Sequence, residues 1–478
     1  MENNKKLHYQ TRNPKKTDLH KILRENYLET FFEKENLGAN LPFHLKREFD
    51  KYLACGVMAY GFARFHCNHC QKDKLVTYSC KGRTICPSCT GRRMSDSAKH
   101  LVENVLPDVP VRQWVLSMPY KHRLILSSNI ELLRSVLAVY HRAISSFYKK
   151  KAKRLNLQGP QSGAISVVQR FGGALNLNVH FHTLFIDGVF HQNANGKLIF
   201  KEIIPDDEDI LLLTRTLKTR INRILQKRGH LEESNDEQQE ENQLSLLKSL
   251  SVQNLVNQSE RPKKIGKYCN PPFEEFRGNR CVYLDGFSLH ANVKIPKENR
   301  SGLEKLCRYI SRGAISKDRI SLNSEGNVLL KLKTQYTDGT THLQFTPNQF
   351  VKRLIALIPP PRSNLLRYYG VFGARHKNRS VITSMATSKK VKKTKVIKYR
   401  TPWAELMKHV FKFEVDYCDG CGTKLELVSC ISSYAICKKL LDHLNLDSEP
   451  VTPRSPRGPP EVEMMYEEGI NYNQENGW

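Results

Sequence analysis

The sequence predicts an α+β protein in which a catalytic body carries an appended metal-binding module. Strand-like and helical segments alternate irregularly along the chain, which favours an α+β arrangement over regular βα repeats. Paired cysteines interrupt an otherwise helical N-terminal region. The length of 478 residues is enough for two to four folded units at roughly 100 to 200 residues each.

The charge of the chain points to a polyanionic partner. Lys and Arg number 76 against 47 Asp and Glu, which gives a formal net charge of +29. Such an excess suits nucleic acid better than a small metabolite. The N-terminus has no apolar signal region, and no apolar run approaches the roughly 20 residues that a spanning helix needs. We therefore expect an intracellular, cytoplasmic protein that binds DNA and no membrane; nothing in the sequence indicates its oligomeric state.

The first predicted domain, residues 1–105, combines helices with a zinc ribbon. Residues 18–60 show apolar positions near the 3.6 period, and a helix resumes after the cysteine-rich segment 65–92. That segment contains two CxxC pairs separated by fifteen residues, a spacing typical of one tetrahedral, structural Zn²⁺ site. The four predicted thiolate ligands are Cys67, Cys70, Cys86 and Cys89.

Neighbouring side chains leave two questions about this module open. Cys80, His66 and His69 lie close enough in the sequence to replace one zinc ligand. Basic residues around the ribbon suit DNA binding, and a solvated charged face is an equally good interpretation. The basic residues predicted to contact DNA here are Arg83, Arg92 and Arg93.

Residues 106–375 are predicted to form the catalytic domain. Segment 111–119 reads as a strand and 129–153 as a helix, and 163–190 reads as two strands joined at Gly172 and Gly173, the second ending at the Asp187-Gly188 turn signal. An acidic, Gln-rich composition predicts a disordered insertion near 230–263. A strand at 281–295, a helix at 299–314 and a hairpin at 328–347 with an Asp-Gly turn complete the domain.

The C-terminal part is predicted to be a small appendage. Residues 376–444 read as a basic connector, clearest at 388–400, and a small CxxC module; residues 445–478 read as a disordered tail. Cys418 and Cys421 form half of a metal site. Cys430 and Cys437 could complete a second zinc centre.

Two histidines stand out on the strand NVHFHTLFIDGVF. His180 and His182 point to the same side because side chains alternate along a strand, while Val179, Phe181 and Phe185 line the opposite, apolar side. Two imidazoles on one open face can hold a divalent ion. From residue types alone, two structural histidines with satisfied hydrogen bonds are the competing interpretation.

The third ligand of such an ion is less well defined. Gln169 lies across the Gly-Gly turn, where its amide oxygen could reach the same ion, although an ordinary backbone-bonded glutamine explains it equally well. His290, in SLHANV, is a weaker competitor.

The helix NRSGLEKLCRYISRGA supplies a candidate nucleophile. Ser301 and Glu304 suggest a capping box, and Gly313 is placed to end the helix. Tyr309 falls between the apolar and basic faces, so its hydroxyl could reach solvent while its ring stays packed. An ordinary boundary tyrosine is the alternative. The apolar stripe is Leu303, Leu306 and Ile310, and the opposing cations, which would attract DNA phosphates, are Lys305, Arg308 and Arg312.

Several of these motifs resemble, in order, a known family. SCKGRTICPSCTGRRM, VRQWVLSMPY, VVQRFGGALNLNVHFHTLFIDGVF, GFSLHANV, LCRYISRGAIS and DGTTHLQFTP are similar to motifs of rolling-circle insertion-sequence transposases of the HUH endonuclease superfamily. The resemblance implies an N-terminal transposase zinc-binding domain and an HUH-type central antiparallel sheet with flanking helices. It also implies that His180 and His182 are the metal-binding pair and that Tyr309 is catalytic.

The function that the resemblance implies is single-strand DNA cleavage and rejoining at the element's ends. The expected enzyme uses Mg²⁺ or Mn²⁺, forms a 5′-phosphotyrosine and leaves a free 3′-OH. Some relatives carry a second tyrosine one helical turn earlier, but Lys305 stands there, which indicates the single-tyrosine kind. The rival interpretations are a replication initiator or relaxase with the same chemistry, and a non-catalytic zinc-ribbon DNA-binding protein.

Overall fold

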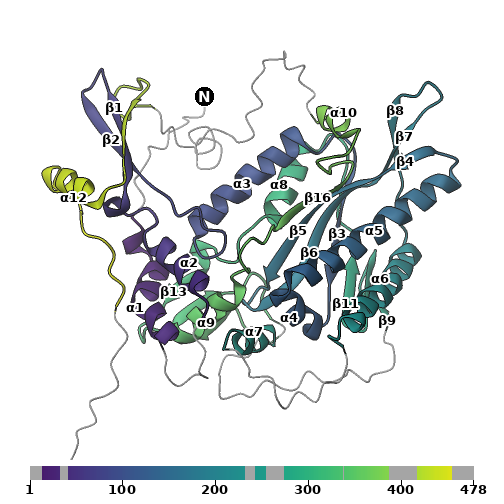
Figure 1. Ribbon diagram of the computed structural model, residues 1–478, viewed down its shortest axis with the longest axis horizontal. Coiled ribbons are helices and arrows are strands. Elements are labelled where there is room, and N and C mark those ends of the chain that lie inside the picture. The colour runs from purple at the N-terminus through teal and green to yellow at the C-terminus, as the bar shows by residue number, and fades with distance from the viewer. Residues whose placement is uncertain are drawn as a thin grey trace, which may run out of the picture.

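A computed structural model describes residues 13–32, 41–231, 243–253, 274–336, 338–386 and 417–454. Within these residues the chain forms helices and antiparallel sheets, so the predicted α+β class is confirmed. The central sheet has eight strands among the described residues (Figure 1). Its order is β16 (Leu366–Gly370), β5 (Gly163–Phe171), β6 (Leu177–Ile186), β3 (Val111–Ser117), β11 (Phe287–His290), β10 (Cys281–Leu284) and β9 (Glu274–Phe276), with β12 (Lys294–Ile295) also on β3.

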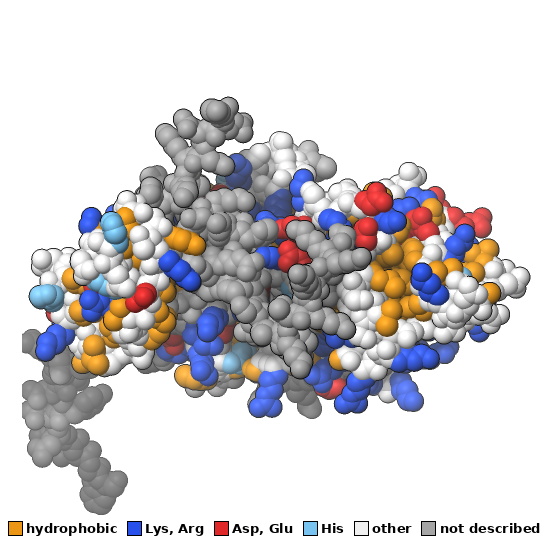
Figure 2. Space-filling model, turned by 90° about the horizontal axis from the view of Figure 1, so that it is seen from above, with side chains coloured by type: hydrophobic (Ala, Val, Ile, Leu, Met, Phe, Trp, Pro, Cys, Tyr) orange, Lys and Arg blue, Asp and Glu red, His pale blue; other side chains and the backbone are white. Residues whose placement is uncertain are grey.

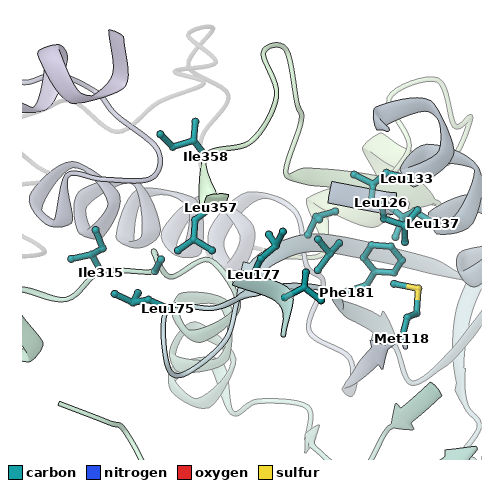
Figure 3. Close-up of a cluster of buried hydrophobic side chains, with 14 of the residues drawn as sticks. Met118, Leu126, Leu133, Leu137, Leu175, Leu177, Phe181, Ile315, Leu357 and Ile358 are labelled. Carbon is teal, nitrogen blue, oxygen red and sulfur yellow. The ribbon is translucent and has the colours of Figure 1, made fainter. Parts of the chain in front are cut away.

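Helices cover both faces of this sheet because its central strands are apolar on both sides. On β6, Phe181 and Phe185 belong to the larger core, which includes side chains of α4 (Tyr120–Ser128), α5 (Ile130–Arg154) and α6 (Asp207–Lys227). Figure 3 shows Phe181 among Met118, Leu126 and Leu137. Leu184 and Ile186 face the other way, toward α3 (Pro87–Asn104) and α8 (Arg300–Ile310). The predicted division of β6 into two faces is thus confirmed.

A helical layer extends this core beyond the sheet. It consists of α1 (Asp18–Phe32), α2 (Phe43–Leu53), α7 (Gln243–Val252) and α9 (Pro347–Leu357). Helix α7 lies inside the predicted disordered insertion, where it packs on α4 and α9 and buries Leu247 and Val252. The prediction of disorder was wrong for residues 243–253, because their apolar side chains pack into the core. Residues 232–242 and 254–273 lie outside the described residues.

Two smaller sheets extend from the body. Strands β4 (Gln158–Gln161), β7 (Gly188–Gln192) and β8 (Leu198–Glu202) form the arm at the right of Figure 1. Strands β13 (Ile320–Leu322), β14 (Val328–Lys331) and β15 (His342–Phe345) form the other sheet, in which β14 and β15 are the predicted hairpin. The remaining short elements are η1 (Pro14–Lys16), η2 (Met58–Tyr60), η3 (Lys317–Arg319) and α10 (Arg379–Ser384).

Segments far apart in the sequence meet in a third small sheet. Strand β1 (Phe62–Cys67) pairs with β2 (Lys72–Thr77) on one side and with β17 (Glu426–Ile431) on the other, and α12 (Tyr434–His443) contacts η2. The C-terminal CxxC segment is therefore part of the N-terminal sheet (Figure 1, left). The predicted connector at 388–400 lies outside the described residues.

Part of the predicted disordered tail also returns to the N-terminal helices. Lys15 Nζ lies 2.7 Å from an Asp447 carboxylate oxygen, and the Tyr60 hydroxyl donates to the Val451 carbonyl at 3.1 Å. The prediction was wrong for residues 445–454, whose contacts come from distant parts of the chain; residues 455–478 lie outside the described range.

Candidate functional site

The paired histidines occupy the middle of the central sheet. Strand β6 has β5 and β3 as neighbours, and His180 and His182 project from its α3/α8 face. Their Nε2 atoms lie 3.1 Å apart. Two ring nitrogens converge on one point, which is the arrangement that ligation of a single ion needs.

Burial keeps both imidazoles neutral. It lowers the pKa of His180 to about 4, and burial together with the nearby His180 and Arg312 lowers the pKa of His182 to about 3. His182 is only 5% exposed. Near neutral pH both rings therefore carry no charge, and a neutral imidazole nitrogen is the form that binds a metal.

Gln169 lies beside the histidines, as the predicted hairpin requires. It is directly opposite His180 in the β5–β6 register. Its Nε2 donates to the Ile310 carbonyl at 2.8 Å, while its buried Oε1 has no partner among the described residues. A buried amide oxygen without a donor is a suitable metal ligand, so the donor set fits a divalent ion.

His290 is less well placed for the same role. It lies opposite Val115 on β3, and Val115 lies opposite His182, so two strand spacings separate the two histidines. That corresponds to about 9.6 Å between their backbones. Gln169, on the strand adjacent to His180, is closer to the pair.

One polar contact to the histidines was missing from the sequence analysis. The side-chain amide of Gln113, on β3, lies 2.7 Å from His182 Nδ1. A hydrogen bond at Nδ1 fixes the ring and determines which nitrogen remains for a metal. The sequence signal for it was a polar residue within the predicted strand VRQWVLSMP, and the structure shows that this residue is buried.

Helix α8 brings Tyr309 over this face. Asn299, rather than the predicted Ser301, caps the helix: its Oδ1 accepts the Gly302 N–H at 2.8 Å. The predicted stripe of Leu303, Leu306 and Ile310 is buried. The hydrogen bond from Gln169 to Ile310 ties the end of α8 to the histidine strand pair.

Tyr309 itself is accessible, as its boundary position predicted. The residue is 47% exposed, and its ring centroid lies 5.8 Å from that of the His182 ring. The Arg312 guanidinium lies 4.5 Å from the Tyr309 ring centroid. The Tyr309 ring thus contacts both a histidine and a cation.

A cavity of about 1070 Å³ opens beside Tyr309. Lys305 and Arg308 from α8 line it, as do Arg312, just beyond the end of α8, and Lys333 from the β14–β15 hairpin. Burial and the neighbouring Arg312 and Arg319 lower the pKa of Lys333 to about 8, a sign of dense positive charge. The remaining lining residues are Met94, Gly173, Leu332, Thr334, Gln335, Tyr336 and Asp338.

The cysteines group differently from the prediction. The thiol sulfurs of Cys55, Cys80, Cys86 and Cys89 lie within 4.8 Å of one another. Cys80, one of the three alternatives, is therefore a ligand candidate, and Cys55, outside any CxxC pair, was missed. The prediction of a single ribbon with ligands Cys67, Cys70, Cys86 and Cys89 was therefore wrong. The Cys86/Cys89 pair and the Cys67/Cys70 pair belong to two different groups.

Cys67 and Cys70 instead meet the C-terminal pair. Their sulfurs and those of Cys418 and Cys421 form a second group, again within 4.8 Å. Cys430 and Cys437, which could have completed a site with Cys418 and Cys421, belong to neither group. His66 pairs with Asp73, and the His69 ring nitrogen lies 3.7 Å from the Cys70 sulfur.

Comparison with known protein families matches two parts of the chain. Residues 163–380, which include the histidine pair and Tyr309, match the family described as "Putative transposase". Residues 23–118, which include the first cysteine group, match the "Transposase zinc-binding domain". The chain belongs to the rolling-circle transposases. No curated protein and no solved structure matches it.

The family assignment makes the transposase a DNA-acting enzyme with structural zinc. Lys and Arg side chains project along one long edge of the face seen in Figure 2. Of the basic residues predicted near the ribbon, Arg83 donates to the Ser363 carbonyl, Arg92 to Ser79 and Arg93 to the Lys81 carbonyl. These intramolecular bonds position the guanidinium groups. No described helix is long and apolar enough to cross a bilayer.

Proposed function

We propose that the transposase cleaves and rejoins single-stranded DNA at the ends of its insertion sequence, with Tyr309 as the nucleophile. The observation that carries the proposal is the juxtaposition of the exposed Tyr309 ring with the converging His180 and His182 nitrogens. This arrangement is the one expected of an HUH endonuclease. The enzyme would act on DNA in the nucleoid.

His180 and His182 would hold a divalent ion, Mg²⁺ or Mn²⁺, with Gln169 Oε1 as the third protein ligand. Such an ion polarises a phosphate oxygen and stabilises charge on the departing oxygen. The unpartnered Gln169 oxygen and the neutral imidazoles support this assignment. Gln113 would hold the His182 ring through Nδ1; with its side-chain amide turned so that Oε1 accepts the Nδ1–H, Nε2 would carry the lone pair that a metal needs.

The side chains around Tyr309 suit a phosphodiester substrate. Lys305, Arg308 and Arg312 would contact the phosphates that flank the cleaved bond. The tyrosine hydroxyl gives up its proton and its oxygen attacks phosphorus, the bond from phosphorus to the 3′-oxygen breaks, and that oxygen takes up a proton and leaves as a 3′-hydroxyl. The new phosphotyrosine ester retains the bond energy, so a later 3′-hydroxyl can displace Tyr309 and restore a phosphodiester.

One experiment tests the nucleophile directly. End-labelled single-stranded DNA from the element's termini is incubated with protein and Mn²⁺, and covalent adducts are resolved on a denaturing gel. Wild type is expected to form an adduct that Tyr309→Phe lacks. Tyr336→Phe is the matched control, because Tyr336 lines the same cavity at similar exposure, and it is expected to retain the adduct.

The outcomes separate the rival functions. An adduct that persists in Tyr309→Phe and disappears in Tyr336→Phe would move the nucleophile to the hairpin. Duplex and single-strand binding without any adduct would favour the non-catalytic zinc-ribbon protein. A replication initiator or relaxase would cleave a plasmid origin sequence and not the element's ends; the match to a transposase zinc-binding domain supports the transposition role instead.

A further inference from the structure

We propose that Cys67, Cys70, Cys418 and Cys421 bind a second Zn²⁺, and that this ion fastens the C-terminal segment 417–454 to the N-terminal sheet. The inference is independent of the catalytic proposal, since these cysteines take no part in the tyrosine chemistry. We call this group the outer cysteine cluster, and Cys55, Cys80, Cys86 and Cys89 the inner cysteine cluster.

The outer cluster has the geometry of two zinc knuckles that face each other. Cys67 and Cys70 lie on the turn between β1 and β2, and Cys418 and Cys421 lie on the turn that precedes β17. The Cys67 and Cys421 sulfurs are 3.5 Å apart. All four cysteines are free thiols. Four thiolates without an oxygen ligand form a closed, tetrahedral site of the kind that structural Zn²⁺ occupies.

The backbone around each pair is arranged to support thiolates. The Cys70 N–H points at the Cys67 sulfur at 3.4 Å, and the Gln71 N–H donates to the Cys67 carbonyl. On the opposite turn, the Gly422 N–H donates to the Cys418 carbonyl and closes the loop. N–H groups directed at sulfur stabilise a bound thiolate, which is a usual outer contact of a metal site.

Apolar contacts alone give this junction little support. The core between α12 and the sheet contains three buried residues, Phe62, Cys437 and Leu441. Of the described residues, the small core around the outer cluster buries Cys67, Cys418 and Leu425. Since a segment with so small a core depends on a metal or another staple for its fold, the ion would supply what apolar packing does not.

Electrostatic contacts align the two turns. Lys74, on β2, lies 3.1 Å from a carboxylate oxygen of Asp419 and donates to the Tyr417 carbonyl. This ion pair places the Cys418 turn over the Cys67 turn, although the chain between Cys67 and Cys421 is 354 residues long. The zinc would thus close a very long loop.

The two clusters differ in access, so their ions should differ in lability. Cys55, Cys86 and Cys89 of the inner cluster are buried, whereas Cys421 of the outer cluster is exposed. A chelator or an oxidant can therefore reach the outer ion first.

Zinc content of the purified full-length protein tests the site. Wild type is expected to contain two zinc ions per chain, and the variant with Cys418→Ser and Cys421→Ser is expected to contain one. Cys430→Ser is the matched control, because Cys430 lies in the same segment but in neither cluster, and it should retain two. A single zinc in wild type, or two zincs in the double variant, would overturn the proposal.

Hydrogen exchange of the same proteins tests the fastening role. After brief chelation that removes one ion, the amides of β17 and α12 should lose protection while those of β5 and β6 keep theirs. The double variant should show the same pattern without chelation, and unchanged protection in β5 and β6 shows that it folds. Full protection of β17 in the double variant would refute the role of the ion in attaching the C-terminal segment.

Discussion

Replacing Asp187 with alanine should strongly destabilise the catalytic domain, although the residue precedes Gly188 in what reads as a turn. Asp187 is completely buried and Arg112 is 2% exposed. The Arg112 guanidinium donates to both carboxylate oxygens at 2.8 and 2.7 Å, and the Tyr148 hydroxyl donates to one of them at 2.9 Å. Burial by itself would lower the pKa of Arg112. The hydrogen bonds and negative charge of Asp187 have the larger effect, so the pKa of Arg112 is raised.

The magnitude follows from what alanine leaves behind. Arg112 would remain as a buried charge held in place by its bond to the Ala291 carbonyl. Removing one partner of a buried, hydrogen-bonded pair costs about 3–5 kcal/mol. Urea unfolding followed by the fluorescence of Trp114, which lies 6.2 Å from Tyr148 between ring centroids, measures the loss in the same region.

A surface pair with the same fork geometry is the control. Arg215 donates to both oxygens of Glu274 at 2.7 and 2.6 Å in an exposed position. Glu274→Ala should barely change the unfolding midpoint, because solvent screens such a pair. If Asp187→Ala shifts the midpoint no more than Glu274→Ala does, the buried pair has no special role and the reasoning fails.

Three further predictions concern the histidines and the inner cluster. Gln113→Leu should lower DNA cleavage by roughly 10- to 100-fold with a nearly unchanged unfolding midpoint; unchanged cleavage rates would show that Gln113 does not orient His182. Burial lowers the pKa of His141 to about 3, so below its ordinary value of 6.5 the unfolded chain binds a proton that the folded chain does not. As the pH is lowered from 6.5 to 3, this group should therefore decrease the free energy of unfolding by about 1.4 kcal/mol per pH unit. His141→Phe, which keeps the stacking on Phe185 and Tyr369, should lessen that fall in unfolding measurements at pH 7 and pH 5, and an identical fall would contradict the assignment. Cys55→Ser should lose one zinc per chain by metal analysis, whereas Cys281→Ser, outside both clusters, should lose none; equal zinc contents would remove Cys55 from the site.

Local periodicity was sufficient to place the side chains of the candidate catalytic site, whereas the roles proposed for them came from the family resemblance. The alternation of β6 placed His180 and His182 on one face, and the helical period placed Tyr309 at the border of α8. Both are properties of a few consecutive residues. The cap of α8 was less certain, because Asn299 and Ser301 are both good caps and only the direction of the incoming chain decides between them.

The cysteine grouping was beyond local reasoning. The spacing of Cys67, Cys70, Cys86 and Cys89 fits one ribbon as well as two half-sites, since a ribbon's ligands come from two separate turns. Cys55 has no paired cysteine near it, and Cys418 lies hundreds of residues from Cys67. Which cysteine pairs come together depends on the pairing of β1 with β17, two strands that lie far apart in the sequence.

Asp187 and α7 illustrate a second limit. Asp-Gly is a common turn signal, and an acidic, Gln-rich stretch commonly lacks a fold, yet both readings rest on composition. Asp187 has a buried guanidinium beside it, and the leucines of α7 have α9 to pack against. Both partners come from distant parts of the chain, so the local sequence could not predict either contact.

Mapping the covalent DNA adduct tests the central claim most directly. The transposase is reacted with single-stranded element-end DNA, the DNA is trimmed by nuclease, and the protein is digested and analysed by mass spectrometry. The account predicts a nucleotide attached through a 5′-phosphate to the peptide that contains Tyr309, in wild type and in Tyr336→Phe. A nucleotide on any other residue, or cleavage of the DNA with no covalent protein intermediate, would contradict it.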